Sequence, residues 1–216
     1  MKILNLYAGI GGNRKLWDSL GDFEITAVEY LPAIAKVYAE HFPKDKIIIA
    51  DAHQYLLEHF AEFDFIWSSP PCPSHSAFRK GFSIANGAKP IFPDMKLYEE
   101  ILFLQHYFKG KWVVENVRPF YEPLIRPQII QRHCFWTNFY IADINLPADV
   151  LNIVGNKKAG DENEKLQIKR LEEKFGISIK NYKGKTARKT LLRNCVEPQL
   201  GLHILKESMK EPSKLF

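Results

Sequence analysis

Five short apolar runs alternate with helical patterns over the first 115 residues, and this alternation constrains the fold more than any other feature. The runs cover residues 2–7, 24–29, 46–50, 63–68 and 111–115. Strands that alternate with helices form parallel sheets, because each parallel connection must cross over the sheet. We therefore predict an α/β fold with a mostly parallel, Rossmann-like sheet and helices on both faces. The 216 residues leave room for one substantial core.

The remaining chain adds two helices and one or two strands to this prediction. Apolar residues at one-face spacing predict a helix that starts near Asp94 and stops at Gly110. A second helix, which starts within residues 161–164, is predicted to end at Gly176. The β-branched and aromatic run at 128–141 predicts one or two further strands.

The ends of the first three apolar runs carry residues suited to binding a nucleoside. The first run enters a turn with Gly9, Gly11 and Gly12, and glycines there allow a ligand close to the backbone and to the N–H groups of the next helix. The second run ends in Glu29-Tyr30, an acid placed for ribose hydroxyls and an aromatic ring that can stack on a base. The third ends in Asp51, an acceptor suited to an exocyclic amino group. The alternative for each acid is a solvated strand end, and for Tyr30 it is core packing.

Cys72 lies in a stiff turn after the fourth run, in the tetrapeptide Pro70-Pro71-Cys72-Pro73. The prolines fix the backbone and remove N–H donors, so neither a helix nor a central strand can continue through them. A thiol presented in this way is a candidate nucleophile, although a lone cysteine more often packs as a small apolar side chain.

These motifs, taken in order, resemble those of the DNA cytosine-5 methyltransferases. The glycine segment 5–12 is similar to the family's opening motif, and Pro70–Ser76 is similar to its nucleophile segment. Glu115-Asn116-Val117 matches the family's Glu-Asn-Val, and 193–196 resembles its closing Gly-Asn-x-Val element. Asn5, Pro73, His75 and Arg193 depart from the family pattern, but none removes a group that the chemistry needs.

The resemblance implies methyl transfer from S-adenosylmethionine to carbon 5 of a flipped-out cytosine in double-stranded DNA. Cys72 would add to carbon 6, and Glu115 would supply a proton near ring nitrogen 3. Arg132 is the weaker match, in a loosely similar Gln-Arg segment, and His133 beside it is interpreted as structural. The implied cofactor-binding residues are Tyr7, Ala8, Gly9, Gly11, Gly12, Glu29, Tyr30, Asp51, Ala52, Asn194 and Val196.

Basic residues are concentrated where the resemblance places the DNA contacts. Residues 151–193 hold twelve Lys or Arg against five acids, and the stretch from Lys180 to Arg193 has no acid. The loop at 73–93 is also basic and without acids, so it could close over a phosphate backbone. A solvated helix face is the alternative for the first stretch. The predicted nucleic-acid-binding residues are Ser76, Arg79, Lys80, Lys183, Lys185, Arg188 and Lys189.

The resemblance divides the chain into a catalytic and cofactor-binding part at 1–140, a small basic recognition region at 141–192 and a returning C-terminal helix at 193–216. Because the recognition region is short, we expect either a short target sequence or help from a second protein or subunit. Restriction-modification in a bacterial or phage-like setting is the context that the resemblance implies.

Three widely spaced cysteines give no disulfide framework, and no residues have the spacing of metal ligands. The chain has no apolar stretch of membrane-spanning length and no secretory leader pattern, so we predict a cytoplasmic protein. Two other functions stay open: cytosine-5 methylation of RNA, recognised by shape, and a non-catalytic DNA-binding or regulatory role.

Overall fold

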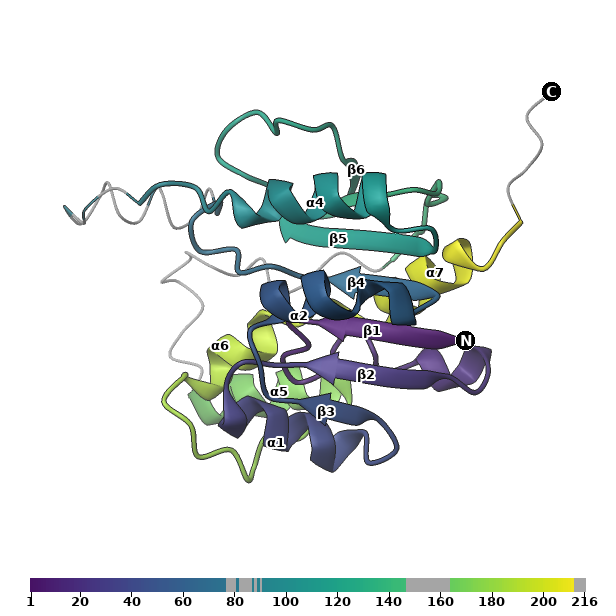
Figure 1. The fold of residues 1–216 in the computed structure, drawn as a ribbon. Coiled ribbons are helices and arrows are strands. Elements are labelled where there is room, and N and C mark those ends of the chain that lie inside the picture. The colour runs from purple at the N-terminus through teal and green to yellow at the C-terminus, as the bar shows by residue number, and fades with distance from the viewer. Residues whose placement is uncertain (77–80, 82–86, 88, 90, 147–163, 212–216) are drawn as a thin grey trace.

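The computed structural model describes residues 1–76, 81, 87, 89, 91–146 and 164–211. Its centre is a seven-stranded sheet with the order β3-β2-β1-β4-β5-β7-β6 (Figure 1). The strands β1 to β5 are parallel, whereas β7 runs antiparallel to both β5 and β6. The strands are β1 (Lys2–Leu6), β2 (Glu24–Val28), β3 (Lys46–Ile48), β4 (Phe65–Ser68), β5 (Lys111–Val117), β6 (Gln128–Ile130) and β7 (His133–Thr137).

Helices cover both faces of the sheet, as the alternating pattern predicts, but the helix expected after the glycine turn is only a short 3-10 helix. The α-helices are α1 (Pro32–His41), α2 (Ala52–His59), α4 (Lys96–Tyr107), α5 (Glu164–Phe175), α6 (Arg188–Arg193) and α7 (Pro198–Ser208), and the 3-10 helices are η1 (Trp17–Leu20) and η2 (Phe60–Glu62). None of these described helices is long and apolar enough to cross a membrane.

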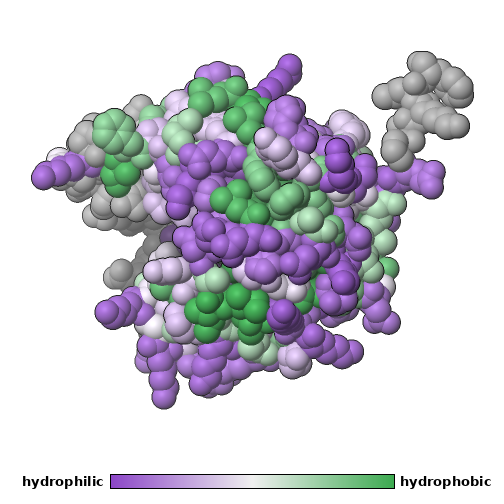
Figure 2. All heavy atoms as spheres, viewed as in Figure 1, coloured by the Kyte–Doolittle hydropathy of each residue, from purple (hydrophilic) through white to green (hydrophobic). Residues whose placement is uncertain are grey.

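The two faces bury different residues because neighbours along a strand point in opposite directions. Leu4 and Leu6 of β1 pack with Leu56 of α2 and with Ile101 of α4 on one face. Ile3 packs on the other face with η1 and α7. Figure 2 views the first face, where hydrophilic side chains cover most of the surface around a few apolar groups. The burial of both faces explains why these strands read as continuous apolar runs instead of alternating ones.

The predicted helix ends agree with the structure at Asp94 and Gly176, whereas α4 ends at Tyr107, before the predicted stop at Gly110. The helix α4 starts at Lys96, with Asp94 Oδ1 accepting a hydrogen bond from Lys96 N at 3.1 Å. The helix α5 ends before Gly176, whose φ of 62° is the left-handed geometry that a helix C-terminus favours. The predicted start of α5 at 161–163 lies outside the described residues.

The helices α5 and α6 belong to a core cluster with the N-terminal half. Leu171 and Phe175 of α5 pack with Ile34 and Val37 of α1 and with Ile10 of the glycine turn. Residues 164–192 therefore rest on the same elements that carry the cofactor motif.

Candidate active site

A cleft of about 1050 Å³ opens at the carboxyl ends of the parallel strands. The chain connections reverse direction between β1 and β4, which are neighbours at the centre of the sheet. Ligands of open α/β sheets bind at such a switch point, because the loops after the two strands separate there. The cleft is lined by the residues that follow β1, β2, β4 and β5, together with residues 190–196 from the C-terminal part except Leu192.

The turn after β1 forms the floor of this cleft and needs its glycines for two different reasons. Gly9 has a φ of 55° and lines the cleft, and a Cβ there would meet only Tyr7 O at 4.0 Å. At Gly12 a Cβ would lie 2.6 Å from Cys195 Cβ. Gly9 thus leaves space for a ligand, whereas Gly12 lets the C-terminal segment pack on the turn.

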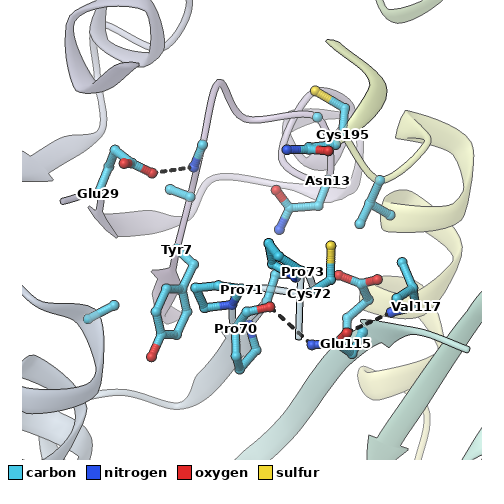
Figure 3. Close-up of a pocket in the computed structure, with 18 of the residues that line it drawn as sticks. Tyr7, Asn13, Glu29, Pro70, Pro71, Cys72, Pro73, Glu115, Val117 and Cys195 are labelled. Atoms are coloured by element: carbon cyan, nitrogen blue, oxygen red, sulfur yellow. Dashed lines mark hydrogen bonds between the residues drawn. The ribbon is translucent and has the colours of Figure 1, made fainter. Parts of the chain in front are cut away.

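Glu29 joins the glycine turn to the start of α1. Its Oε2 accepts a hydrogen bond from Gly9 N at 3.0 Å (Figure 3). Its Oε1 accepts one from Leu31 N at 2.9 Å. Burial raises the pKa of this carboxyl group, while the backbone donors act in the opposite direction. Glu29 is 9% exposed and lines the cleft, so its carboxylate can also accept a hydrogen bond from a ligand hydroxyl.

Tyr30 and Asp51 follow at the neighbouring strand ends. The Tyr30 ring is 69% exposed and lines the cleft, so core packing does not explain this residue. Asp51 also lines the cleft, and its Oδ1 caps α2 by accepting a hydrogen bond from Gln54 N at 3.1 Å.

Cys72 is half-buried in the cleft, at the start of a tight turn. Its carbonyl accepts hydrogen bonds from His75 N at 3.0 Å and from Ser76 N at 3.1 Å. Phe120 N donates to His75 O at 3.0 Å, so the loop after β5 holds this turn. His75 is buried and its Nδ1 lies 2.6 Å from Tyr121 OH, which gives the residue a structural role.

The Glu-Asn-Val segment lies at the end of β5, beside the cysteine turn. Asn116 Nδ2 donates to Pro70 O at 3.0 Å, and Asn116 Oδ1 accepts from Val117 N at 2.9 Å (Figure 3). Asn116 therefore ties β5 to the prolines before Cys72. Glu115 is 7% exposed, and its carboxylate and the Cys72 thiol extend into the same cleft (Figure 3).

His133 contacts Glu115, which the sequence did not indicate. Its Nδ1 lies 2.7 Å from Glu115 Oε1, and its Nε2 accepts a hydrogen bond from Arg132 Nε at 3.2 Å. Arg132 also donates to Arg193 O at 3.2 Å. These contacts come from the register of β5 against β7, which places His133 diagonally opposite Glu115.

Glu100 of α4 was also missed, and it supports the floor of the cleft. This carboxylate is fully buried and accepts hydrogen bonds from Tyr7 OH at 2.6 Å and from Ser68 Oγ at 2.5 Å. His53 Nδ1 lies 3.0 Å from the same carboxylate. The bond with Glu100 is the main cause of a raised pKa at His53, and burial is the main cause of a raised pKa at Tyr7. Glu100 thus joins the ends of β1 and β4 to α2 and α4.

The cleft brings together most of the predicted site residues, but not all of them. Gly11 does not line it, because its Cβ position points at the Phe42 ring. Lys183, Lys185, Arg188 and Lys189 lie elsewhere on the surface, and Arg79 and Lys80 lie outside the described residues. Tyr182 is buried, so its ring is not part of the exposed surface of the basic stretch from Lys180 to Arg193. Ser76, Asn194 and Val196 line the cleft, as do Asp94 and Lys96, which the sequence did not single out.

The strand order, the antiparallel β7 and the cleft at the β1–β4 switch point define an α/β protein with the fold of the S-adenosylmethionine-dependent methyltransferases. The family model for C-5 cytosine-specific DNA methylases matches residues 1–123. With more than half of its residues matched, the chain belongs to this family. The matched range includes Cys72 and Glu115 and ends before β6.

Individual relatives match shorter parts of the chain. Type II methyltransferase M.Bsp6I of Bacillus sp. (strain RFL6) is 32% identical over 113 residues, which are 49% of this chain and 36% of that protein. A solved Spodoptera frugiperda DNMT2 mutant is 28% identical, with a TM-score of 0.38 over 55% of this chain and 36% of that one. Entamoeba histolytica methyltransferase EhMeth is 13% identical, with a TM-score of 0.37 over 54% of this chain and 38% of that one. The chain thus spans about a third of the length of these relatives.

Proposed function

We propose that this chain transfers a methyl group from S-adenosylmethionine to carbon 5 of cytosine in DNA, through a covalent adduct with Cys72. One observation carries the proposal: the Cys72 thiol and the Glu115 carboxylate share a single cleft with the nucleoside-binding strand ends. Family membership supports the same chemistry.

The residues of the cleft fit the donor. Gly9 leaves open space above the turn, Glu29 has lone pairs for ribose hydroxyls, and the exposed Tyr30 ring can stack on the adenine. Asp51 is an acceptor for the adenine amino group. When bound, S-adenosylmethionine supplies an electrophilic methyl group on a sulfonium centre.

Cys72 and Glu115 make the target carbon nucleophilic. The Cys72 thiolate forms a bond to carbon 6, and the displaced electron pair moves toward ring nitrogen 3, where Glu115 gives up a proton. Carbon 5 of the resulting enamine takes up the methyl group. Loss of the proton from carbon 5 to water then expels the Cys72 thiolate and restores the aromatic ring, while nitrogen 3 returns its proton to Glu115.

The geometry requires a base that has left the helix stack. Cys72 is half-buried within the cleft, where a paired cytosine in a duplex cannot reach it. Lys183, Lys185 and Arg188 are exposed cations in the segment that leads into the cleft residues 190–196. We assign them to the DNA backbone. We also keep the expectation that the short recognition region reads a short sequence or acts with a second subunit.

The test is the transfer of labelled methyl from S-adenosylmethionine to unmodified DNA and, in parallel, to RNA, with mass spectrometry of the product nucleosides. We expect 5-methylcytosine in DNA. A Cys72→Ala variant should bind the donor with unchanged affinity and transfer nothing, and Glu115→Gln should be slower by roughly 10²-fold or more. DNA that contains 5-fluorocytosine should trap the wild type in an adduct stable to denaturant, since fluorine cannot leave as a proton does.

The outcomes separate the alternatives. Label in RNA alone would replace DNA as the substrate polymer while keeping the chemistry. Methyl transfer by Cys72→Ala would contradict the covalent mechanism. Donor binding without transfer to either polymer would favour a non-catalytic role or an obligatory partner.

A further inference from the structure

Arg132, His133 and Glu115 are linked by two hydrogen bonds, and the groups that can donate fix the direction of both bonds. Arg132 carries only N–H donors and stays charged, so the ring nitrogen that it faces, His133 Nε2, must be an acceptor. A neutral imidazole with an accepting Nε2 carries its proton on Nδ1. His133 therefore donates from Nδ1 to Glu115 Oε1, at 2.7 Å.

The opposite tautomer would break both contacts of the ring. A proton on Nε2 would face the Nε–H of Arg132, and Nδ1 would then have no hydrogen to donate to Glu115 Oε1. Both side chains of the His133–Glu115 pair are buried, so the Nδ1–H bond holds the Glu115 carboxylate within the cleft.

Arg132 is held in this position by a second bond. Its Nη2 donates to the carbonyl of Arg193, the last residue of α6, where helix carbonyls lack partners within the helix. Cys134 on β7 lies near both Glu115 and Arg118. Burial raises the pKa of the Cys134 thiol to about 11, so this residue stays neutral.

We propose that His133 is a positioning residue that orients Glu115 through its Nδ1–H, and that Arg132 acts through His133 by fixing the tautomer that makes this bond. This inference rests on the proposed function. It gives Arg132 a role within the protein in addition to any contact with DNA.

The tautomer can be measured without activity, by NMR of the protein with 15N-labelled histidine rings. In its neutral form, we expect the ring of wild-type His133 to carry its proton on Nδ1. Arg132→Met removes the donor at similar length, and the neutral ring should then show a mixture of the two tautomers. A wild-type ring that carries its proton on Nε2 would overturn the inference.

Activity variants test the consequence for Glu115. His133→Asn keeps an N–H donor near the Nδ1 position and should stay within about threefold of the wild-type single-turnover rate. His133→Phe keeps the size without the donor and should lose roughly 10²-fold, the cost of a misplaced catalytic group. His203→Phe, which removes a bond to Ala142 O outside the cleft, is the control for a general effect on the fold.

The conservative variants separate positioning from structural support. Arg132→Met should lose less of the single-turnover rate than His133→Phe, because the imidazole is still present to donate to Glu115. Equal rates for His133→Phe and the wild type would refute the inference even though the proposed function stood. An inactive wild type would instead count against the proposed function, and the NMR result would be unaffected.

Discussion

Gly12 packs directly against Cys195, so that a Cβ on Gly12 would lie 2.6 Å from Cys195 Cβ and 2.7 Å from Val196 O. The second contact is with backbone, which has little freedom to move. This packing places the residues of the C-terminal motif beside the N-terminal glycine turn.

Gly12→Ala should therefore destabilise the protein. An overpacked contact with backbone costs roughly 1–3 kcal/mol, and the urea unfolding midpoint should fall accordingly. Gly81→Ala is the matched control, because a Cβ there would meet nothing within 4 Å. Equal midpoints for the two variants would mean that the C-terminal segment does not pack as described.

Gly9→Ala should weaken cofactor binding in addition to lowering stability. The left-handed φ of 55° makes alanine unfavourable by about 1–2 kcal/mol, but no side chain stands in the way of the new methyl group. The methyl group would occupy cleft space assigned to the cofactor. Isothermal calorimetry should show a loss of S-adenosylmethionine affinity of tenfold or more, and unchanged affinity would remove Gly9 from the cofactor site.

One thiol of three should react in the native protein. Cys134 and Cys195 are buried, and burial raises the pKa of Cys195 to about 12, so its reactive thiolate is scarce near neutral pH. Cys72 is half-buried at the cleft. Iodoacetamide at pH 8 should add one label, located at Cys72 by peptide mass spectrometry, and Cys72→Ser should take up none. A label on native Cys195 would contradict its burial.

The His53–Glu100 pair should make stability depend on pH. The hydrogen bond with Glu100 raises the pKa of His53 above that of an unfolded histidine, near 6.5. Its contribution to stability is therefore fully present below about 6.5 and is lost as the pH rises through the folded pKa. Glu99 and Lys96 also act on this ring, with opposite signs.

His53→Gln should remove this dependence. The difference in unfolding free energy between wild type and variant should shrink from about pH 6 to about pH 8.5, as measured by urea unfolding. Burial lowers the pKa of His75, so His75 also makes stability depend on pH. Both proteins retain His75, and its contribution therefore cancels in the difference. If the unfolding free energies of the wild type and His53→Gln changed in parallel with pH, the His53–Glu100 pair would not take up a proton on folding.

Lys183 and Lys185 should contribute to DNA affinity through charge alone. Each lysine removed from a phosphate reduces the slope of log affinity against log salt by about 1, so the double alanine variant should show a slope smaller by up to about 2. Lys206→Ala with Lys210→Ala, on and just after α7, removes the same charge outside the cleft and should leave the slope unchanged. We exclude Arg188 from this variant, because its Nη2 donates to the carbonyls of Lys180 and Tyr182 and so supports the local fold.

The strands and the strand-end residues were predictable because both depend on local sequence. A buried parallel strand is apolar on both faces, and the residue after it must lie at the carboxyl edge of the sheet. The positions of Glu29, Asp51 and Cys72 follow from that rule alone. The same reasoning places Glu115 at the end of β5.

The partners of these residues were not predictable, because they depend on pairings between distant segments. His133 meets Glu115 only through the antiparallel register of β7 on β5, and nothing near His133 in the sequence indicates it. Glu100 looks like an ordinary charged helix residue until Tyr7 and Ser68 are placed against it. Tyr182 lies among cations in the sequence, and only the packing of α5 and α6 on α1 shows that it is buried.

The hydrogen bond from Trp17 Nε1 to Gly201 O, 3.2 Å long, delays folding during synthesis, because its two residues are far apart in the sequence. Trp17 leaves the ribosome before Gly201 of α7, which follows 184 residues later. At roughly 5–20 residues per second, the nascent turn and the apolar side of Trp17 wait about 10–40 s for their partners. A growing chain of this protein should therefore be a substrate for ribosome-associated chaperones, and its capacity to bind the methyl donor should appear only after Gly201 has emerged.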